Sequence, residues 1–522
     1  MPLPGNILTP HNSSLRRAVA GTAAALRDKL DSPGLVQRAV LSDILSRNET
    51  SAYGTMYGFC HIRNPADFQM HVPVVTYEEL TPWIERIAQG EQSILTAEPV
   101  VAFEETGGSI GGRKLIPYTI GGLAAFRCGL LPWLDDLFFH CNEIASGAFY
   151  WAISPACRTP STTPGGVPIG LPNDAAYLGP EIGAAIIARL AVPPEAGTIA
   201  DFDSWRDYTM RHLLACENLS MISVWSPTFL TELLEYAKQH RDKLAAAISE
   251  SGNSARARHV ASVLSQPSPD YAALWPQLRL ISCWDHASAR PVARRLRQQF
   301  PTVHVQGKGL LATEGLVTIP LTGYAFPVLA LESAFFEFVD DNGRIWFADD
   351  MQENELYRLL MTTHSGLYRY DIGDMVAVRG FAGRTPMLEF VGRSNAASDL
   401  CGEKLTDSFV TRQLVLLDQN FAMLAPAIDS RPRGYVLLLD ADAVSSEESK
   451  VLALRLDALL YDNPQYAYAR RLGQLTAVTP VRCRTPAANW LEHRARSKGV
   501  RLGDVKLPSL HAGSDWMNWV RI

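Results

Sequence analysis

The side chains best placed for chemistry stand in a glycine-rich stretch at 305–315, Val-Gln-Gly-Lys-Gly-Leu-Leu-Ala-Thr-Glu-Gly. An alternating β-branched run at 302–305 predicts a strand before it, and the glycines allow the backbone to approach a ligand closely. Open α/β sheets bind ligands beyond the carboxyl ends of their strands. Thr313 and Glu314 therefore suit a magnesium-bound polyphosphate, with the hydroxyl on phosphate and the carboxylate on the metal. A glycine turn with a solvated glutamate is the alternative.

A second glycine-rich loop, Glu-Glu-Thr-Gly-Gly-Ser-Ile-Gly-Gly-Arg-Lys at 104–114, follows a predicted strand at 100–103. Consecutive glycines let several backbone N–H groups converge on phosphate, and Ser109, Arg113 and Lys114 add donors and charge. The Walker pattern requires Gly-Lys-Ser/Thr followed by a helix, and the dinucleotide-binding pattern requires G-x-G-x-x-G. Neither spacing is present, so the loop is not a standard nucleotide loop.

The same loop matches G-x-S-x-G at 107–111, the pattern of a serine hydrolase with Ser109 as nucleophile. That motif requires a helix directly after the serine. Gly111, Gly112 and Pro117 disfavour a helix there, and residues 115–119 have an extended pattern. The hydrolase is therefore the less favoured hypothesis.

The composition is that of a soluble globular protein of two or more domains, with 522 residues, 47% hydrophobic and 20% charged. A net charge of -6 and a pI near 6.1 argue against general nucleic-acid binding. The eight cysteines show no zinc-binding spacing and are expected to be reduced thiols. There is no signal-peptide pattern and no apolar run of the roughly 18 residues that a membrane span needs. We expect a cytoplasmic protein without membrane association.

The elements around the first loop predict a βαβ unit. A strand at 278–283, a helix ending at Phe300 and the strand at 302–305 follow one another, which places the glycine-rich stretch at a carboxyl end. Helical spacing runs through 12–48, and Thr76 with Glu79 forms a capping-box pattern. Short strands between 328 and 391 predict a barrel or a small antiparallel sheet.

Two polar positions follow within and after these strands. Asp374 ends the stretch Ser-Gly-Leu-Tyr-Arg-Tyr-Asp-Ile-Gly-Asp at 365–374, where a carboxylate can accept both ribose hydroxyls. The small polar segment at 392–398 fits an interdomain hinge. His286 is either a catalytic base or, as we favour, a hydrogen-bonded structural histidine. Aromatic residues permit a hydrophobic or aromatic acyl group, although most must belong to the core; those assigned to the substrate pocket are Tyr118, Trp225 and Trp284.

In combination, these motifs resemble the adenylate-forming superfamily of acyl ligases and, within it, the Gretchen Hagen family of acyl-acid amido synthetases. The resemblance spans about 70 to 510 and rests on the segments Gly307–Gly315, Phe335–Phe338, Gly366–Tyr370, Gly402–Leu405 and Lys506–Pro508. It implies an α/β fold with a large N-terminal domain of β-sheets flanked by helices plus a β-barrel, and a small mobile α+β C-terminal domain. The implied boundaries are 1–393 for the adenylation domain, 394–398 for the hinge and 399–522 for the cap.

The resemblance also implies roles for individual residues. The nucleotide-binding set is Thr106, Gly107, Gly108, Ser109, Gly111, Thr313, Asp374 and Arg393. The implied catalytic residues are Lys506, Glu314 and Lys114, with Glu314 also holding Mg²⁺. The family loop usually reads Ser-Ser-Gly-Thr-Ser, whereas this chain has Glu105-Thr106-Gly107-Gly108-Ser109.

The implied reaction uses ATP and Mg²⁺ to convert a carboxylic acid into an acyl-adenylate with release of pyrophosphate, and then passes the acyl group to an amine or amino acid. Thioester formation with coenzyme A and ester formation with an alcohol are the alternatives within the superfamily. A protein that binds ATP without turnover is a third possibility. The identities of the acid and of the acceptor do not follow from the sequence.

Overall fold

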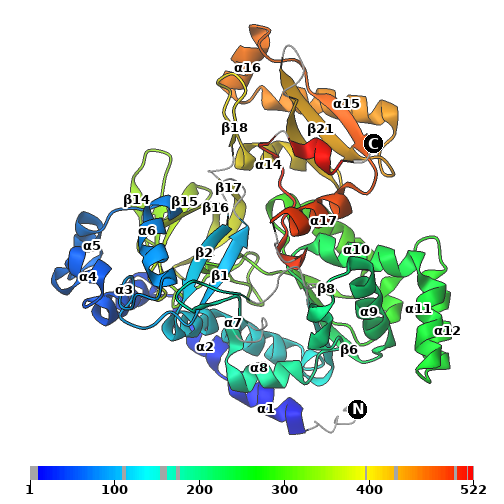
Figure 1. Cartoon of the computed structure of the whole chain (residues 1–522), viewed down its shortest axis with the longest axis horizontal. Coiled ribbons are helices and arrows are strands. Elements are labelled where there is room, and N and C mark those ends of the chain that lie inside the picture. The colour runs from blue at the N-terminus through cyan, green and yellow to red at the C-terminus, as the bar shows by residue number, and fades with distance from the viewer. Residues whose placement is uncertain are drawn as a thin grey trace.

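The structure is a computed structural model that describes residues 10–107, 113–152, 161–171, 177–393, 397–427, 433–498, 502–513 and 515–520. Most of the chain up to Arg393 forms the larger, lower part of the molecule, and the α+β region that contains α14, α15 and α16 stands above it (Figure 1). None of the described helices combines the length and apolar character that crossing a bilayer demands.

A parallel sheet lies at the right of the lower part (Figure 1). Its order is β3-β6-β7-β8, with bounds Ala148–Trp151, Leu219–Ser223, Leu280–Cys283 and His304–Gly307. Both central strands are buried along their whole length, as parallel strands covered on both faces must be. The predicted βαβ unit is confirmed, because α13 (Arg290–Gln299) joins β7 to its parallel neighbour β8.

A long antiparallel sheet follows in the chain. Its order is β11-β12-β17-β16-β15-β13-β14, with bounds Thr318–Ile319, Val328–Leu329, Thr385–Arg393, Tyr370–Ala382, Leu356–Thr362, Phe335–Val339 and Ile345–Trp346. The strands predicted between 328 and 391 are therefore confirmed. The described strand order has two ends, β11 and β14, so the expected barrel is not confirmed.

A small sheet contains the strands on either side of the second glycine-rich loop, residues 104–114. Its order is β2-β1-β5-β4, with bounds Arg113–Tyr118, Ala102–Gly107, Pro168–Ile169 and Ser161–Thr162. The strand β2 leads through the N-cap Thr119 into α7 (Ile120–His140), a helix that contains Pro132 without being broken there. Arg113 begins a strand and not a helix, so the local structure after the G-x-S-x-G pattern lacks the helix that a hydrolase elbow requires.

Helices pack around these sheets. The N-terminal group consists of α1 Pro10–Val19, α2 Thr22–Arg27, α3 Pro33–Asn48, α4 Ala52–Met56, α5 Pro65–His71 and α6 Tyr77–Ala88. The predicted capping box of Thr76 and Glu79 is present at the start of α6. Near the parallel sheet lie α9 Phe202–Ala215 and α10 Pro227–Gln239, with α11 Arg241–Glu250 and α12 Ser254–Leu264 farther out, while α8 Pro180–Ile187 lies near α1 (Figure 1).

The C-terminal region has its own sheet, in the order β20-β21-β22, with bounds Ala422–Ala427, Gly434–Asp440 and Thr479–Cys483. Its helices are α14 Asp407–Val415, α15 Ser446–Leu460 and α16 Pro464–Arg471. The last α-helix of the described residues, α17 (Pro486–Lys498), lies between this region and α10 (Figure 1).

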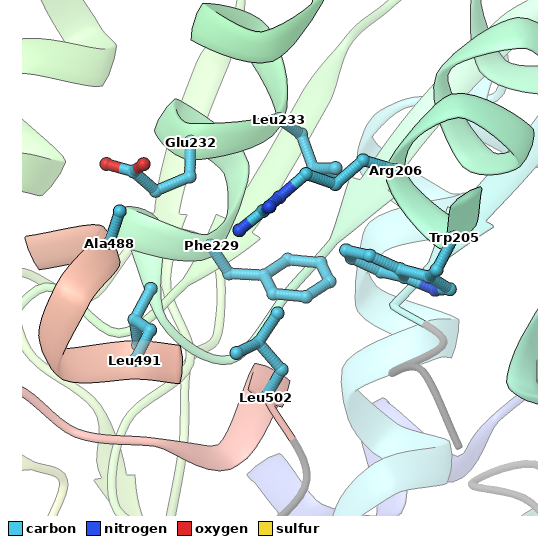
Figure 2. Close-up of a pocket in the computed structure, with 8 residues that line it drawn as sticks. All are labelled: Trp205, Arg206, Phe229, Glu232, Leu233, Ala488, Leu491 and Leu502. Carbon is cyan, nitrogen blue, oxygen red and sulfur yellow. The ribbon is translucent and has the colours of Figure 1, made fainter. Parts of the chain in front are cut away.

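Helix α17 contacts the larger part directly. Arg206 of α9 donates to Glu492 of α17 at 2.6 Å. Next to this ion pair, Leu491 and Leu502 face Phe229 of α10 across a small pocket (Figure 2). One continuous hydrophobic cluster contains side chains from α9, α10 and α17. The C-terminal residues therefore bury apolar surface against the larger part in this arrangement.

Candidate active site

The hairpin of β1 and β2, which flanks the glycine-rich loop of residues 104–114, forms one edge of the candidate site. Thr106 is the cross-strand partner of Lys114, and Gly107 is the partner of Arg113. The Lys114 ammonium lies 5.0 Å from the ring centre of Tyr77. Gly108, Ser109 and Gly111, which are predicted to bind phosphate, lie outside the described residues.

The second edge is the turn that carries Thr313 and Glu314. These two residues join β9 (Leu311–Ala312) to β10 (Gly315–Leu316). The hydroxyl of Tyr118, which is 1% exposed at the end of β2, donates to the carbonyl of Thr313. Tyr118 therefore links the hairpin to this turn.

The third edge lies in the antiparallel sheet. Asp374 of β16 and Arg393 of β17 are cross-strand partners, and the Arg393 Nε donates to Asp374 Oδ1 at 3.1 Å. Asp374 is completely buried. Its second oxygen, Oδ2, has no hydrogen-bond partner among the described residues. Because a buried carboxylate oxygen normally has a partner, this atom fits the acceptor that a ribose hydroxyl requires.

Charges on the three edges act on one another. Burial raises the pKa of Glu314, and the charge of Asp374 acts in the same direction, while Arg393 and Lys114 oppose it. The Asp374 carboxylate raises the pKa of Arg393, with Glu314 contributing to the same shift. Side chains from β2, the 313–314 turn, β16 and β17 thus share one electrostatic environment.

Lys506 reaches the larger part from the C-terminal region. Its ammonium lies 4.9 Å from the ring centre of Trp284 and 5.9 Å from that of Phe390. Trp284 follows β7, and its ring centre is 6.0 Å from that of Trp225, which follows β6. Lys308, beyond β8, lies 5.0 Å from the Trp225 ring. The carboxyl ends of three neighbouring parallel strands therefore present two indole rings and a cation.

A row of polar side chains lies two residues before Trp225, Trp284 and Lys308 on the same three strands. Ser223, Ser282 and Gln306 are cross-strand partners on β6, β7 and β8. Lys308 donates to the Ser223 hydroxyl at 2.7 Å, and Trp133 of α7 donates to Gln306 at 2.8 Å. Since side chains two residues apart share a face, this row and the indole rings lie on the same side of the sheet.

Lys308 and Phe390 were not among the residues predicted for the site. Lys308 lies within the glycine-rich stretch, and its charge was the available signal. Phe390 stands in a largely apolar strand, and nothing in the sequence pattern indicated that it belongs to the site. His286 accepts a hydrogen bond from the backbone N–H of Phe390 at 3.4 Å, and burial lowers its pKa, which agrees with a structural role.

Two of the segments that carry the family resemblance, Phe335–Phe338 and Gly366–Tyr370, contact each other through an ion pair in the core and not at the candidate site. The Arg369 guanidinium donates to Glu337 at 2.9 and 3.1 Å, and to the carbonyls of Gln69 and Val72. Arg369 and Glu337 are both buried. The Phe335–Phe338 and Gly366–Tyr370 segments therefore form a structural ion pair in the core.

A magnesium ion fits the site through Glu314. Among the described residues no group of three or more acidic, histidine or cysteine side chains is arranged to hold a metal by itself. Mg²⁺ in nucleotide sites usually takes one or two carboxylates and completes its coordination with phosphate oxygens and water. The buried carboxylate of Glu314 would supply one such ligand.

Sequence comparison identifies the family. The GH3 family N-terminal domain matches residues 22–274, and the GH3 family central domain matches residues 327–393. The chain therefore belongs to the GH3 family, and the predicted resemblance is confirmed.

The curated relatives are amido synthetases. A probable indole-3-acetic acid-amido synthetase, GH3.12 of Oryza sativa subsp. japonica, is 27% identical over 439 residues, which cover 69% of this chain and 68% of the relative. The jasmonoyl–L-amino acid synthetase JAR6 of Nicotiana attenuata is 24% identical over 419 residues, covering 72% and 71%.

Solved structures share the fold. The GH3.15 acyl acid amido synthetase matches 99% of this chain and 97% of its own with a TM-score of 0.82 at 19% identity. A 2-hydroxyisobutyryl-CoA ligase in its postadenylation state matches 99% and 95% with a TM-score of 0.52 at 11% identity. The expected adenylate-forming fold is confirmed.

Proposed function

We propose that this chain is an acyl-acid amido synthetase that adenylates a carboxylic acid with ATP and passes the acyl group to an amine or amino acid. Family membership and the amido synthetase relatives support the reaction class. The observation that carries the assignment to this site is the shared environment of Lys114, Glu314, Asp374 and Arg393, with a buried Asp374 oxygen left for a ribose hydroxyl.

In this proposal the acid's carboxylate attacks the α-phosphorus of ATP, and pyrophosphate leaves. Phosphoryl and nucleotidyl transfer depend mainly on positioning and on charge stabilisation. Lys114 would offset charge on the leaving phosphates, and Lys506 would do so at the α-phosphate and the attacking carboxylate. Asp374 would accept the ribose hydroxyls. A Mg²⁺ ion held by Glu314 would neutralise phosphate charge.

The acid would lie against the indole rings of Trp225 and Trp284. These rings stand at the carboxyl ends of β6 and β7, and Lys506 contacts one of them. Ligands in open α/β sheets bind at this edge. Residues 1–393, 394–398 and 399–522 remain our proposed adenylation domain, hinge and cap, with rotation of the cap admitting the acceptor after adenylation.

The test is release of pyrophosphate from ATP and Mg²⁺ with a panel of carboxylic acids and hydroxylamine as a general acceptor. We expect one class of acid to give pyrophosphate and a hydroxamate, and Lys506→Ala to abolish the release. No pyrophosphate with any acid, together with cleavage of an ester that Ser109→Ala prevents, would replace this proposal by the hydrolase.

A second function, acyl-CoA synthesis, is favoured by the fold shared with 2-hydroxyisobutyryl-CoA ligase. Once an acid is found, hydroxylamine is replaced by twenty amino acids, by coenzyme A or by simple alcohols. We expect an amide with one class of amino acid. A thioester as the sole product would assign the chain to the CoA ligases.

A further inference from the structure

The first residue of α14, Asp407, lies where the C-terminal region meets the end of β17. The N-cap of the helix is Thr406, whose hydroxyl accepts from the backbone N–H of Phe409 at 3.3 Å. Thr406 and not Asp407 therefore caps this helix, and the Asp407 carboxylate makes other contacts.

Three backbone N–H groups face this carboxylate, and one of them makes a hydrogen bond to it. The N–H of Leu510 donates to Asp407 Oδ1 at 3.0 Å. The backbone N–H groups of Ser509 and Arg393 face the same carboxylate and favour its ionised form, which lowers its pKa. Ser509 and Leu510 follow Lys506 closely, whereas Arg393 ends β17 on the other side of the proposed hinge. One carboxylate therefore joins the segment that carries Lys506 to the strand that carries Arg393.

Charge reinforces these contacts. Burial raises the pKa of Asp407, and the Arg393 guanidinium opposes this shift by favouring the ionised carboxylate. Asp407 in turn contributes to the raised pKa of Arg393. Arg393 also donates to Asp374. The Arg393 guanidinium therefore binds Asp374 directly and interacts through its charge with Asp407 of the C-terminal region.

The junction is packed closely at this point. A Cβ atom added to Gly392 would lie 2.6 Å from the Cα of Ser408, and Gly392 has a φ of +138°. Backbone atoms of β17 and α14 are thus in contact, with no room for an intervening side chain. The position of Asp407 relative to Arg393 is fixed by this contact.

The backbone from Lys506 to His511 is also held within the C-terminal region. The N–H of Leu424 in β20 donates to Ser509, and the N–H of His511 donates back to Leu424, both at 2.8 Å. Trp490 of α17 donates to the carbonyl of Lys506 at 2.9 Å. The backbone around Lys506 is therefore held by the C-terminal region, and Asp407 links that backbone to the larger part.

We propose that Asp407 is a positioning residue for adenylation, which holds Lys506 against Trp284 and Phe390 by tying the 506–510 segment to Arg393. This inference rests on the proposed function. Because Arg393 precedes the proposed hinge whereas Asp407 and Leu510 follow it, rotation of the cap would separate Asp407 from the end of β17. Asp407 therefore acts on adenylation and not on the transfer of the acyl group.

The test is Asp407→Asn, which keeps the shape of the side chain but removes its charge and one acceptor oxygen. With an accepted acid, we expect kcat for pyrophosphate release to fall roughly ten- to a hundred-fold, the scale of a small misplacement of a catalytic group. We expect the KM for ATP to change by less than about threefold and the consumption of preformed acyl-adenylate by the amine to be unaffected.

The matched control is Asp67→Asn. Asp67 also lies in the first turn of a helix and accepts from a backbone N–H, that of Arg63 at 3.1 Å, but it belongs to α5. This variant should leave both half-reactions unchanged. Asp407→Ser provides a second variant that preserves a helix-starting residue should the asparagine variant fail to fold.

A double variant decides whether Asp407 acts through Lys506. Added to Lys506→Ala, Asp407→Asn should cause no further loss, since the residue that it positions is already gone. A full additional loss in the double variant, or equal loss in both half-reactions of Asp407→Asn, would overturn the inference.

A measurement without turnover separates this inference from the proposed function. Hydrogen exchange of the 505–511 segment and acylation of Lys506 by an amine-reactive probe, both read by mass spectrometry, should be faster in Asp407→Asn than in the native chain and in Asp67→Asn. Unchanged rates would refute the link even if the native chain adenylates an acid. If the rates are faster in Asp407→Asn but the native chain adenylates no carboxylic acid, only the proposed function would be refuted.

Discussion

Asp374 and Arg393 are cross-strand partners joined by a 3.1 Å hydrogen bond, and the carboxylate is completely buried while its second oxygen lacks a partner among the described residues. The ion pair orients one oxygen and leaves the other for a ligand. An arrangement of this kind costs stability in the absence of nucleotide, because a buried acceptor without a hydrogen bond retains its desolvation penalty. It is therefore typical of a binding site and not of a structural ion pair.

We predict that Asp374→Asn raises the KM for ATP by roughly 10- to 150-fold, which corresponds to the loss of about 1.5–3 kcal/mol from a hydrogen bond to a charged group. The measurement compares ATP with 2′-deoxy- and 3′-deoxy-ATP. The native chain should discriminate against at least one deoxy analogue, and the variant should not. Equal use of all three nucleotides by the native chain would assign the ribose to other residues.

For Glu314, the pH dependence follows from its burial. Its pKa is raised above the ordinary 4.5 by burial, with Asp374 adding to the shift. The ionised form is the one that would hold Mg²⁺, so at limiting Mg²⁺ the rate of pyrophosphate release should fall on acidification at a pH above 4.5. Saturating Mg²⁺ should shift this acidic fall in rate to lower pH, because the cation competes with the proton for the carboxylate.

The variant that tests this assignment is Glu314→Gln. It should need at least tenfold more Mg²⁺ for half-maximal rate and should lose the Mg²⁺-dependent shift of the acidic fall in rate, since an uncharged amide is a weak ligand for this ion. An unaltered Mg²⁺ requirement in Glu314→Gln would remove Glu314 from the metal site.

Glu232 predicts a pH effect on stability at the seam where α17 meets α10. Burial raises its pKa to about 7; Glu235, Asp440 and Glu492 act in the same direction, and Arg206 opposes them. A carboxyl group whose pKa is higher in the folded chain than in the unfolded chain stabilises the fold while it is protonated. This contribution is complete at a pH below about 4.5 and is lost as the pH rises through about 7.

Glu232→Gln should therefore lose less stability than the native chain between pH 5 and pH 8. The measurement is the melting temperature at several pH values in this interval, with Glu235→Gln, an exposed neighbour on the same helix, as the control. A native chain and a Glu232→Gln variant with parallel melting temperatures across the interval would contradict the prediction.

Local sequence rules were sufficient where both partners of an interaction stand close together in the chain. Thr76 and Glu79 are three residues apart, and their capping box is present. The strand, helix and strand that end at Gly307 form the expected parallel unit, because their apolar patterns belong to single elements. The helical spacing of 12–48 instead divides into three helices. Gly21, with a φ of +84°, and Pro33 stand at the breaks and explain them.

Contacts between distant segments were not visible in the sequence. Asp407 lies 103 positions from Leu510, and nothing in either local pattern indicates the hydrogen bond between them. The contact of α17 with the larger part includes the ion pair of Arg206 and Glu492, which are 286 positions apart in the chain. The resemblance supplied Lys506 as a catalytic residue, but its ring contacts with Trp284 and Phe390 required the fold.

The pairing of Arg369 with Glu337 yields a prediction about stability. The side chains are 4% and 1% exposed, and the pair joins β13 to the segment before β16. Removing one partner leaves an uncompensated buried charge, so Arg369→Met should lower the free energy of unfolding by about 3–5 kcal/mol. Urea denaturation of the native chain and the variant measures this loss. Arg86→Met, which breaks the surface pair with Glu91, should cost no more than about 1 kcal/mol. Equal losses in the two variants would show that the charge of Glu337 is accommodated without Arg369, and that the Phe335–Phe338 and Gly366–Tyr370 segments do not depend on this ion pair for their packing.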